Sequence, residues 1–239
     1  MVEINKENIP KHIAFIMDGN GRWATKRGLA RNLGHKAGAD AMKKVITACY
    51  NYGVEVVTFY CFSTENWKRP KSEVDGIFSL AKKYFKENEA SLIEKGIQIR
   101  TMGDVSCLPC GATEAINEVC EKTKHLSKMV VNLAVNYGGR AEILRAVNNL
   151  ISDGVKKVDD ALFREYLYTT SLPDPDIVVR TSGEERVSGF LLYQLAYSEF
   201  YFTSTHWPDF NEEEVEKVII SYQKRNRKFG GLIGDNNEK

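Results

Sequence analysis

The sequence predicts a single α/β domain built on a central, mainly parallel six-stranded sheet flanked by helices. Short apolar runs that suit buried strands alternate along the chain with longer segments of helical periodicity, a pattern typical of a parallel sheet covered by helices. The 239 residues are 43% hydrophobic, which is ample for one sizeable core. No internal repeat or Gly-, Pro- or Ser-rich linker divides the chain. We therefore expect one domain over 1–239, with flexible ends at 1–10 and 232–239.

Six short apolar runs are expected to form the strands. Runs of this kind, bounded by polar loops, suit strands that are buried on both faces of a parallel sheet. In chain order they are 13–17, 54–62, 97–102, 129–135, 177–180 and 200–203.

Six segments of helical periodicity separate or follow these strands. In the second segment, apolar residues from Val74 to Phe85 recur at the i, i+3, i+4, i+7 spacing of one helix face. We expect Ser72 to cap the N-terminus of this helix, with Asp75 three residues later as its partner. The expected helices cover about 36–51, 72–95, 111–124, 139–152, 159–167 and 211–229.

The charge balance and the cysteine pattern exclude several classes of protein. Lysine and arginine (33) nearly cancel aspartate and glutamate (32), so the net charge is only +1, and we expect no nucleic-acid partner. The first eight residues are polar, and no apolar run approaches the roughly 20 residues that span a bilayer. The five cysteines are scattered, which suits a reducing compartment. These features indicate a cytoplasmic protein.

Cys107 and Cys110 form a CxxC motif inside a loop that contains glycine and proline. A zinc site would need a second Cys or His pair at matching spacing, and none follows. A redox motif would open a helix directly after a strand. We expect these two thiols to have no role.

The first strand runs directly into the loop Asp18-Gly19-Asn20-Gly21-Arg22. A carboxylate at the end of a strand can hold a divalent cation. The glycines allow a tight turn whose N–H groups point at an anion as the next helix starts. Arg22 can bind phosphate oxygens with two parallel hydrogen bonds. The loop therefore predicts a diphosphate site, and a basic cluster follows it: Lys26, Arg27, Arg31, His35 and Lys36.

Two other interpretations of this loop stay open on local evidence. It could be a common glycine turn followed by a solvated basic helix. It could also be a dinucleotide site, because Gly19-x-Gly21-x-x-Ala24 fits the relaxed fingerprint. That fingerprint needs an acidic residue at the end of the second strand. Asp40 has about the right spacing but falls inside a helical segment, which weakens the dinucleotide interpretation.

Two more polar loops follow predicted strands. Phe62 to Pro70 carries hydroxyl, amide, aromatic and guanidinium groups, and Arg180 to Ser188 holds two arginines and a serine that suit a second anion. In a parallel sheet the ligand lies outside the carboxyl ends of the strands, so the three loops are expected to form one site. No P-loop, G-x-S-x-G or H-E-x-x-H motif is present. His12, His125 and His206 are expected at the surface or in the core.

These loops resemble the cis-prenyltransferases, and most closely the bacterial undecaprenyl diphosphate synthases. The resemblance covers nearly the whole chain, and no other family we know combines its motifs. The matching stretches are His12 to Ala24, Gly34 to Gly38, Phe62 to Pro70, Asn136 to Arg140, Arg180-Thr181 with Gly183-Glu184, and Tyr201 to Thr203 with Trp207 to Phe210.

The resemblance implies a homodimeric enzyme with a hydrophobic tunnel, working at the cytoplasmic membrane face with transient membrane association for product release. It implies that isopentenyl diphosphate is condensed onto an allylic diphosphate, with farnesyl diphosphate expected, using Mg²⁺. The expected product is a long-chain Z-polyprenyl diphosphate such as undecaprenyl diphosphate, a lipid-carrier precursor for cell-wall synthesis. The alternatives are a short- or medium-chain synthase, or a non-catalytic partner subunit; the presence of Asp18 disfavours the latter.

The resemblance also implies roles for individual residues. Catalytic roles fall on Asp18 and Asn66, and Mg²⁺ binding falls on Asp18 and Glu199. Arg180, Arg186 and Ser188 are expected to hold isopentenyl diphosphate. The other substrate-binding residues it implies are Gly19, Asn20, Gly21, Arg22, Trp23, Arg31, His35, Phe62, Ser63, Glu65, Trp67, Arg69 and Glu73.

Three positions depart from the family pattern. Glu185 stands where the best-known bacterial relatives have histidine, so an additional metal-site imidazole is absent. Ser182 replaces a glycine in the same loop. Lys228 replaces the arginine of a C-terminal Arg-x-Gly motif, and it keeps the charge but loses the bidentate fork.

Overall fold

A computed structural model describes residues 4–106 and 108–225 of the chain. Its core is one six-stranded sheet with the spatial order β3-β4-β2-β1-β5-β6. All pairs of neighbouring strands are parallel, so the α/β fold expected from the alternating pattern is confirmed, with a sheet that is entirely parallel. The strands are β1 (His12–Ile16), β2 (Val56–Ser63), β3 (Ile97–Met102), β4 (Met129–Tyr137), β5 (Ile177–Arg180) and β6 (Glu199–Phe202).

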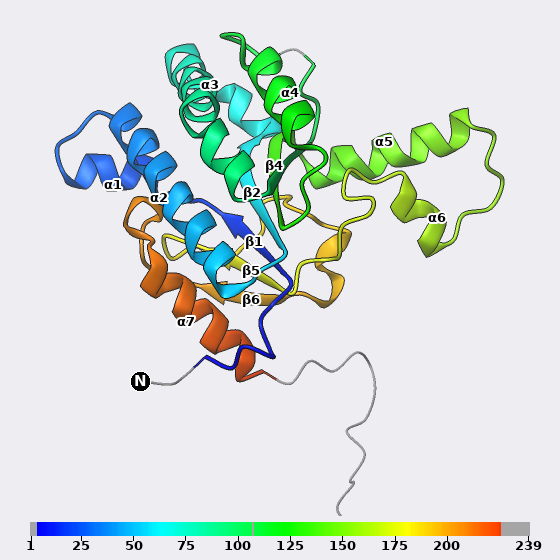
Figure 1. The fold of residues 1–239 in the computed structure, drawn as a ribbon. Helices are drawn as coiled ribbons and strands as arrows, with labels where there is room; N and C mark the ends of the chain where they lie inside the picture. The colour runs from blue at the N-terminus through cyan, green and yellow to red at the C-terminus, as the bar shows by residue number, and fades with distance from the viewer. Residues whose placement is uncertain (1–3, 107, 226–239) are drawn as a thin grey trace, which may run out of the picture.

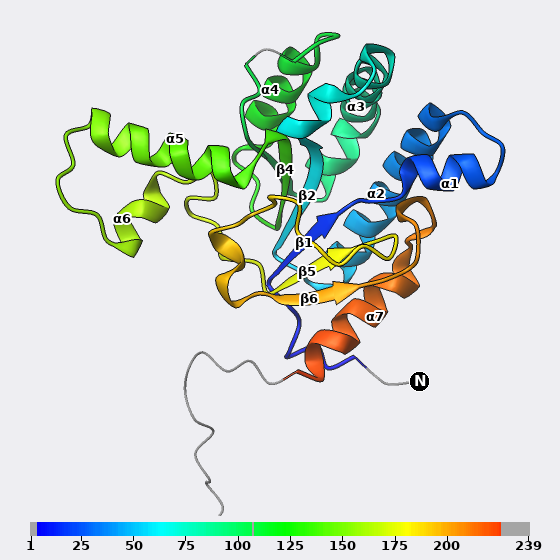
Figure 2. The ribbon, with the colours of Figure 1, turned by 180° about the vertical axis from the view of Figure 1, so that it is seen from behind.

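Helices cover the sheet unequally on its two faces. Figures 1 and 2 show α2 and α7 over one face, the 181–198 segment over the opposite face, and α5 with α6 extending to one side. None of the helices in the described residues is long and apolar enough to cross a membrane. The helices are α1 (Asn20–Lys26), α2 (Arg31–Tyr52), α3 (Lys71–Glu94), α4 (Ala112–Thr123), α5 (Gly139–Ser152), α6 (Asp160–Glu165) and α7 (Glu212–Gln223).

Alternate residues of β1 enter two different cores. Ile13 and Phe15 belong to the larger core under the helices, whereas Ala14 and Ile16 belong to the smaller core on the opposite face. Both sets are buried, as a parallel strand in the middle of a sheet requires. The Phe15 ring lies near Trp207, with ring centroids 5.8 Å apart, which fixes the loop after β6 beside the end of β1.

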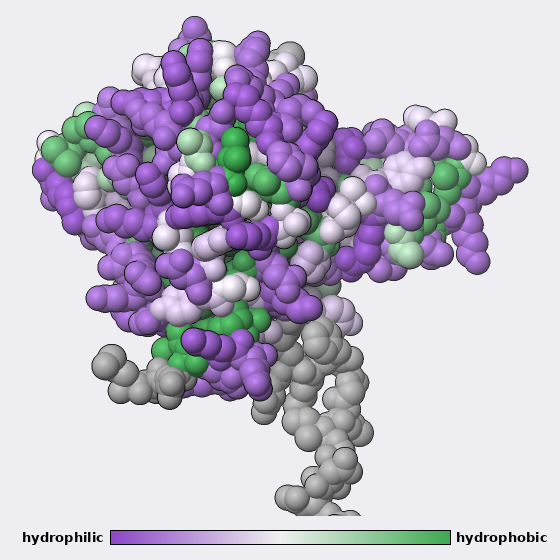
Figure 3. Space-filling model, in the orientation of Figure 1, coloured by the Kyte–Doolittle hydropathy of each residue, from purple (hydrophilic) through white to green (hydrophobic). Residues whose placement is uncertain are grey.

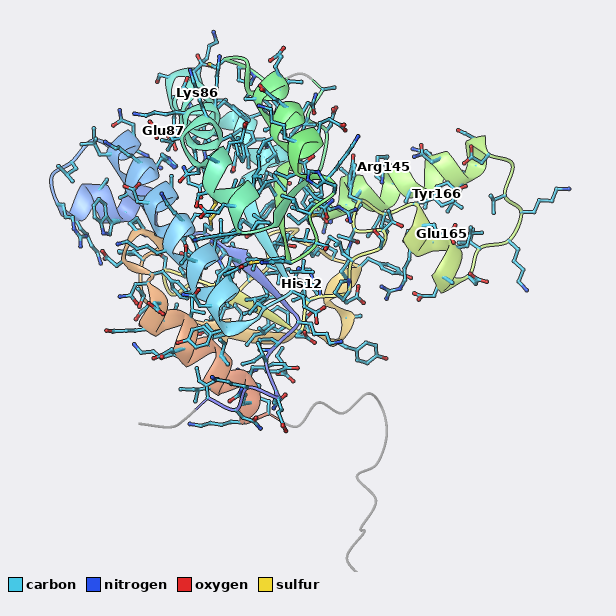
Figure 4. All side chains as sticks on the ribbon, viewed as in Figure 1. His12, Lys86, Glu87, Arg145, Glu165 and Tyr166 are labelled. Atoms are coloured by element: carbon cyan, nitrogen blue, oxygen red, sulfur yellow. The ribbon has the colours of Figure 1, made fainter. Side chains whose placement is uncertain are left out.

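His12 and the α5–α6 extension are held by specific hydrogen bonds. His12 is fully buried at the start of β1 (Figure 4), and its Nε2 lies 2.7 Å from Thr58 Oγ1.

In the α5–α6 extension, the Arg145 guanidinium donates to the Tyr166 carbonyl at 2.6 Å and stacks 3.8 Å from the Tyr168 ring centroid. These bonds connect α5 to the segment that follows α6.

The boundaries of several helices differ from those expected. The prediction that Ser72 caps a helix is wrong, because α3 begins at Lys71 and Ser72 lies inside its first turn. Pro70, at φ −52°, is pre-set for the start of a helix and moves the boundary forward. The helix expected from residue 36 begins at Arg31 instead.

The two ends of the chain lie close to one another in the described part. The Gln223 amide donates to the carbonyls of Asn5 (2.7 Å) and Asn8 (2.9 Å), while the flexibility of residues 1–10 stays a prediction. The helix α7 is capped by Asn211, whose side chain accepts from the Glu214 N–H at 3.2 Å. The expected continuation of this helix to residue 229, and the flexible tail 232–239, lie outside the described residues.

The contact between α1 and α2 requires glycine at position 34. A Cβ there would lie 2.0 Å from the Asn20 carbonyl oxygen. We predict that Gly34→Ala lowers the free energy of unfolding by roughly 1–3 kcal/mol through overpacking. Gly76→Ala is the matched control, because nothing lies within 4 Å of its added Cβ, and it should stabilise the helix by up to about 1 kcal/mol. Urea unfolding followed by circular dichroism measures the free energy of unfolding of both variants. Equal changes in the two variants would contradict the packing argument.

Candidate active site

A polar cavity of about 290 Å³ lies at the carboxyl ends of β1, β2 and β5. Residues from all three predicted loops line it, as expected from the rule that parallel sheets bind ligands at this edge. The predicted residues that line it are Asp18, Gly19, Asn20, Gly21, Arg22, Arg31, His35, Ser63, Asn66, Arg69, Arg180 and Ser188. The structure therefore brings together most of the site that the sequence predicts.

Asp18 is held between two arginines at the end of β1. Arg22 lies 2.9 Å from one carboxylate oxygen and Arg180 lies 3.0 Å from the other. Burial raises the pKa of Asp18, but the hydrogen bonds from Arg180 and Arg22 outweigh it and hold the pKa below its usual range. Asp18 is therefore ionised at neutral pH, and it balances part of the positive charge around the cavity.

The backbone of Asp18 is fixed as firmly as its side chain. Its carbonyl accepts hydrogen bonds from Thr181 Oγ1 (2.7 Å), Ser182 Oγ (3.2 Å) and the Trp207 N–H (3.1 Å). The next residue, Gly19, has φ +104° and begins α1. A side chain at position 19 would collide with the Ser182 hydroxyl, 1.9 Å from the added Cβ. The turn therefore needs glycine for both its conformation and its space.

Ser182 and His206 form a polar pair beside this turn that sequence reasoning missed. Ser182 is a non-glycine residue at φ +75°, which is an unfavourable conformation for a side-chain-bearing residue. Its hydroxyl lies 2.5 Å from His206 Nδ1. The sequence predicts only that His206 lies at the surface or in the core, and no local pattern indicates that it meets a loop 24 residues earlier in the chain.

Arg180 supports the second side of the cavity from β5. Its side chain is only 5% exposed, and Nη1 donates to Ser188 Oγ at 2.9 Å and to the Arg186 carbonyl. The Arg186 guanidinium points elsewhere, since it pairs with Glu184 and is 62% exposed. Arg180 and Ser188 thus face the cavity together, whereas the charge of Arg186 lies at its edge.

Glu73 gathers three basic side chains on the opposite wall. It lies 3.2 Å from His35, 3.1 Å from Arg69 and 3.5 Å from Arg31. Burial raises the pKa of Glu73, but the hydrogen bond with His35 and the charges of both arginines outweigh it, so the pKa is lowered. Burial lowers the pKa of His35, against the opposing effect of Glu73. Glu73 thereby orients Arg31 and His35 of α2, and Arg69 just before α3, at the cavity.

The segment after β2 is ordered by its own side chains. Ser63 and Asn66 form a capping box at the start of η1 (Thr64–Lys68), in which the Asn66 side chain accepts from the Ser63 N–H at 3.1 Å. The Trp67 indole donates to Asn136 Oδ1 at 2.8 Å. These bonds place Ser63 and Asn66 at the cavity, while Trp67 faces away from it toward β4.

Seven of the predicted residues do not line the polar cavity, and Glu73 and Arg186, described above, are two of them. Trp23 donates to Asp209 at 2.7 Å; Glu65 and Trp67 lie on η1, and Phe62 is buried beside Phe78. Glu199 pairs with Arg225 at 2.7 Å. It begins β6 opposite Ile177, whereas Arg180, next to Asp18, pairs with the far end of that strand. One chain therefore does not bring Asp18 and Glu199 together, and the role of Glu199 stays a prediction.

The charged residues fit a magnesium ion that shares a phosphate ligand. In the described part of the chain no cluster of three or more His, Cys, Asp or Glu side chains could hold a metal alone. Mg²⁺, however, is commonly held by one or two carboxylates together with substrate phosphates and waters. Asp18, with one ionised carboxylate at the cavity, matches that donor set. Lys228 and its departure from the family pattern lie outside the described residues.

An apolar cavity of about 120 Å³ continues from the polar one between α2 and α3. The two cavities share five residues: Met17, Asn20, His35, Cys61 and Ile77. The predicted apolar face of α3 lines it through Ile77, Phe78, Ala81, Tyr84 and Phe85. The site therefore has a cationic end and an apolar end in direct continuity.

Several lining residues were not predicted from the sequence. Tyr60 lines the polar cavity and donates to the Tyr137 carbonyl at 3.3 Å; burial raises the pKa of its phenol to about 12. Cys61 lies where the two cavities meet, and burial raises the pKa of its thiol to about 12, so it is unreactive at neutral pH. Tyr60 and Cys61 lie near the end of a predicted strand, and this position is the only feature of the sequence that indicates a place at the site.

The Asp18 charge should stabilise the fold in a pH-dependent way. We predict that Asp18→Asn lowers the free energy of unfolding by about 1–3 kcal/mol at pH 7, because it leaves buried Arg180 without its counter-charge. Since the pKa of Asp18 is lowered in the folded state, the difference should persist above the unfolded-state pKa of about 3.9 and vanish as the pH falls through the folded-state pKa.

Urea unfolding of both proteins from pH 7 down to acidic pH measures this difference. Asp75→Asn is the control, because it breaks the ion pair between Asp75, which is 37% exposed, and Lys71, which is 91% exposed. Ion pairs as exposed as this one contribute little to the free energy of unfolding. A pH-independent difference for Asp18→Asn, or one equal to that of the control, would contradict the assignment.

The chain is similar to known proteins over nearly its whole length. Residues 16–230 match the family model described as putative undecaprenyl diphosphate synthase. The isoprenyl transferase of Clostridium tetani is 47% identical over 96% of this chain and 92% of its own length. That of Fusobacterium nucleatum is 48% identical over 95% of this chain and 98% of its own length.

Two solved structures have the same fold. The crystal structure of lavandulyl diphosphate synthase from Lavandula x intermedia, in complex with dimethylallyl diphosphate, has a TM-score of 0.90 and 34% identity, over 94% of this chain and all of that one. A probable undecaprenyl diphosphate synthase from Campylobacter jejuni has a TM-score of 0.78 and 34% identity, over 97% of this chain and all of that one. The chain therefore belongs to the isoprenyl transferase family, the cis-prenyltransferase enzymes that include undecaprenyl diphosphate synthase.

Proposed function

We propose that this isoprenyl transferase condenses isopentenyl diphosphate onto an allylic diphosphate, with farnesyl diphosphate as the expected primer, to give a Z-polyprenyl diphosphate. The observation that carries the proposal is the continuity of the cationic cavity with the apolar cavity between α2 and α3. Such a site is complementary to a molecule with a diphosphate head and a hydrocarbon tail. The dimethylallyl diphosphate in the related lavandulyl diphosphate synthase belongs to the same chemical class.

The head of the allylic substrate is assigned to the first loop and α2. Arg22, Arg31 and His35 surround the polar cavity next to the Gly19–Gly21 turn. Arg22 and Arg31 are at present paired with carboxylates, and diphosphate oxygens would compete for the same donors. Arginine suits this exchange because its fork binds phosphate and carboxylate with the same geometry.

The head of isopentenyl diphosphate is assigned to the β5 side of the cavity. Arg180 and Ser188 face it together, 2.9 Å apart. Arg186 lies at the edge, where it can leave Glu184 for a bound anion. Two separate groups of cations on opposite sides of Asp18 would hold two diphosphates without placing them in direct contact.

The reaction requires stabilisation of a charged leaving group. The C–O bond of the allylic diphosphate breaks, its carbon joins isopentenyl diphosphate, and one proton is lost from the latter. Preorganised cations at the departing diphosphate lower the barrier because charge develops there. Bound Mg²⁺, held by Asp18 and the diphosphate oxygens, would add further neutralisation of that charge. Asn66 is positioned by its capping bond to Ser63, so its amide nitrogen remains free to contact substrate.

The length of the product is the main alternative within this proposal. An undecaprenyl product would need more room than the apolar cavity of about 120 Å³ provides, so α2 and α3 would have to separate as the chain grows. A short- or medium-chain product, which needs less separation of the two helices, is the second candidate. A non-catalytic role is disfavoured, because Asp18 and its complete set of cations are present.

Incubation with Mg²⁺, farnesyl diphosphate and labelled isopentenyl diphosphate tests the activity. We predict a labelled product that extracts into butanol, whose chain length decides between the long- and short-chain alternatives. Asp18→Ala should lower turnover at least about 100-fold, by loss of charge organisation at the leaving group, while circular dichroism shows a folded protein. Glu87→Ala, on the exposed end of α3, is the control. No product from the wild-type protein would refute the proposal.

We also propose a homodimer that forms through the outer face of α5. Leu144, Val147 and Ile151 lie at i, i+3 and i+7 on this helix and are 63%, 38% and 67% exposed. The helix extends beyond the sheet (Figure 1), so a second copy could pack along its whole length. A stripe of this spacing is typical of a helix that packs against another helix.

Charge on this stripe should separate the subunits. Leu144→Asp with Ile151→Asp is predicted to convert the dimer to a monomer in sedimentation velocity, because the two carboxylates would be buried without partners. The control is Ile93→Asp on α3, where an isolated apolar residue is 38% exposed. Persistence of the dimer in the double variant would exclude this face as the interface.

A further inference from the structure

The corner between α1 and α2, residues 25–36, presents apolar side chains to solvent. Leu29 is 40% exposed and Leu33 is 44% exposed, and Ala30 between them is exposed as well. Figure 3 shows hydrophobic surface at the left edge of the molecule, where Figure 1 places this corner. Single exposed leucines are ordinary, but two of them at the tip of one protruding corner form an anchor-like pair.

The same corner is strongly basic within an almost neutral chain. Between Gly19 and Ala39 the sequence has no aspartate or glutamate and five lysines and arginines, whereas the whole chain has a net charge of only +1. Arg22 and Arg31 line the polar cavity, but Lys26 and Lys36 are exposed on the outside. Neither lysine has an ion pair with any of the residues that the structure describes.

We propose that the α1–α2 corner docks on an anionic membrane surface. The leucines would enter the boundary between lipid headgroups and acyl chains, while Lys26 and Lys36 meet lipid phosphates. An apolar pair surrounded by cations is the combination that binds such surfaces, since the two contributions add. The proposal rests on the proposed function in one respect: docking on a membrane would let a product with a hydrocarbon tail pass from the enzyme into lipid.

The geometry of α2 connects this corner to the site. Leu33 and Lys36 are three residues apart and share one face of the helix. His35 is two residues from Leu33, about 200° around the helix, and lines both cavities. One turn later, Gly38, Ala39 and Met42 line the apolar cavity. The cavity-lining residues of α2 therefore lie on the side of the helix opposite Leu33, so docking of the outer face would hold the site one helix diameter, roughly 10 Å, from the lipid surface.

The other exposed apolar face, on α5, lacks the exposed lysines of the α1–α2 corner. On α5, Leu144 and Ile151 are more exposed than either leucine of the corner, but the helix has no lysine. The guanidinium of Arg145 is occupied by Tyr166 and Tyr168, and Arg140, at the start of the helix, is its one exposed cation. An apolar stripe with a single cation at one end suits a second copy of the chain better than an anionic lipid surface. The charge around the corner is what assigns it to an anionic lipid surface.

Sedimentation with sucrose-loaded vesicles tests the proposal on the full-length protein. Phosphatidylcholine vesicles with and without phosphatidylglycerol are compared. We expect binding only to the anionic vesicles, with a further loss at high salt. Leu29→Ser with Leu33→Ser should lower the partition coefficient at least about tenfold, and Lys26→Glu with Lys36→Glu should lower it by more than about fivefold for each charge.

Each double variant has a matched control elsewhere on the surface. Ile93→Ser with Val158→Ser removes two apolar side chains that are 38% and 45% exposed. Lys156→Glu with Lys157→Glu makes the same change in net charge on two exposed lysines. Wild-type-like binding of both controls supports a specific surface. Equal losses in the controls, or no binding of the wild-type protein to anionic vesicles, would overturn the proposal and leave a protein partner as the occupant of the corner.

A second measurement separates this proposal from the proposed function. Prenyl transfer is assayed in detergent, where no membrane is needed, and again with anionic vesicles in place of detergent. The corner variants should match the wild-type protein in detergent and lose its activity gain on vesicles. Absence of product in detergent would refute the proposed function without affecting vesicle binding, whereas unchanged vesicle stimulation in the leucine variant would refute the docking surface alone.

Discussion

The carboxylate of Asp18, clamped between Arg22 and Arg180, is the interaction on which the rest of the site depends. Arg180 is only 5% exposed, and a buried guanidinium is tolerated only with a charged partner and further hydrogen bonds. The partner can reach it because β1 and β5 are neighbours in the sheet, in register from Ile13 opposite Ile177 onward. The bonds from the 181–182 loop and Trp207 then fix the Asp18 carbonyl, so three segments distant in the sequence converge on one residue.

The two carboxylates of the site, Asp18 and Glu73, balance much of the positive charge around the cavity. Asp18 balances the arginines of the β1 and β5 loops, and Glu73 balances Arg31, Arg69 and His35 on the helical side. Both acids have lowered pKa values for this reason. A diphosphate would take over the same donors, so binding would exchange one set of charge-assisted hydrogen bonds for another instead of burying new charge.

Two exposed apolar regions of the chain differ in what surrounds them. The stripe on α5 has one exposed arginine, Arg140, at one end and no lysine, whereas the α1–α2 corner carries two exposed lysines and shares α2 with the cavities. Neutral apolar stripes favour protein contacts, and basic apolar corners favour anionic lipid. The proposed surfaces for a second subunit and for the membrane therefore lie on separate elements, α5 and the α1–α2 corner.

The sequence by itself determined the number and kind of strands, their parallel arrangement and the three polar loops, because burial pattern and turn residues are local signals. It was wrong about Ser72, since Pro70 outweighed a weaker capping preference. Only the tertiary structure decided which loop side chains meet: Arg180 reaches Asp18 and Ser182 reaches His206, while Glu199 lies at the opposite end of its strand. Such partnerships depend on the order β3-β4-β2-β1-β5-β6, and strand order follows from long-range packing that no local pattern encodes.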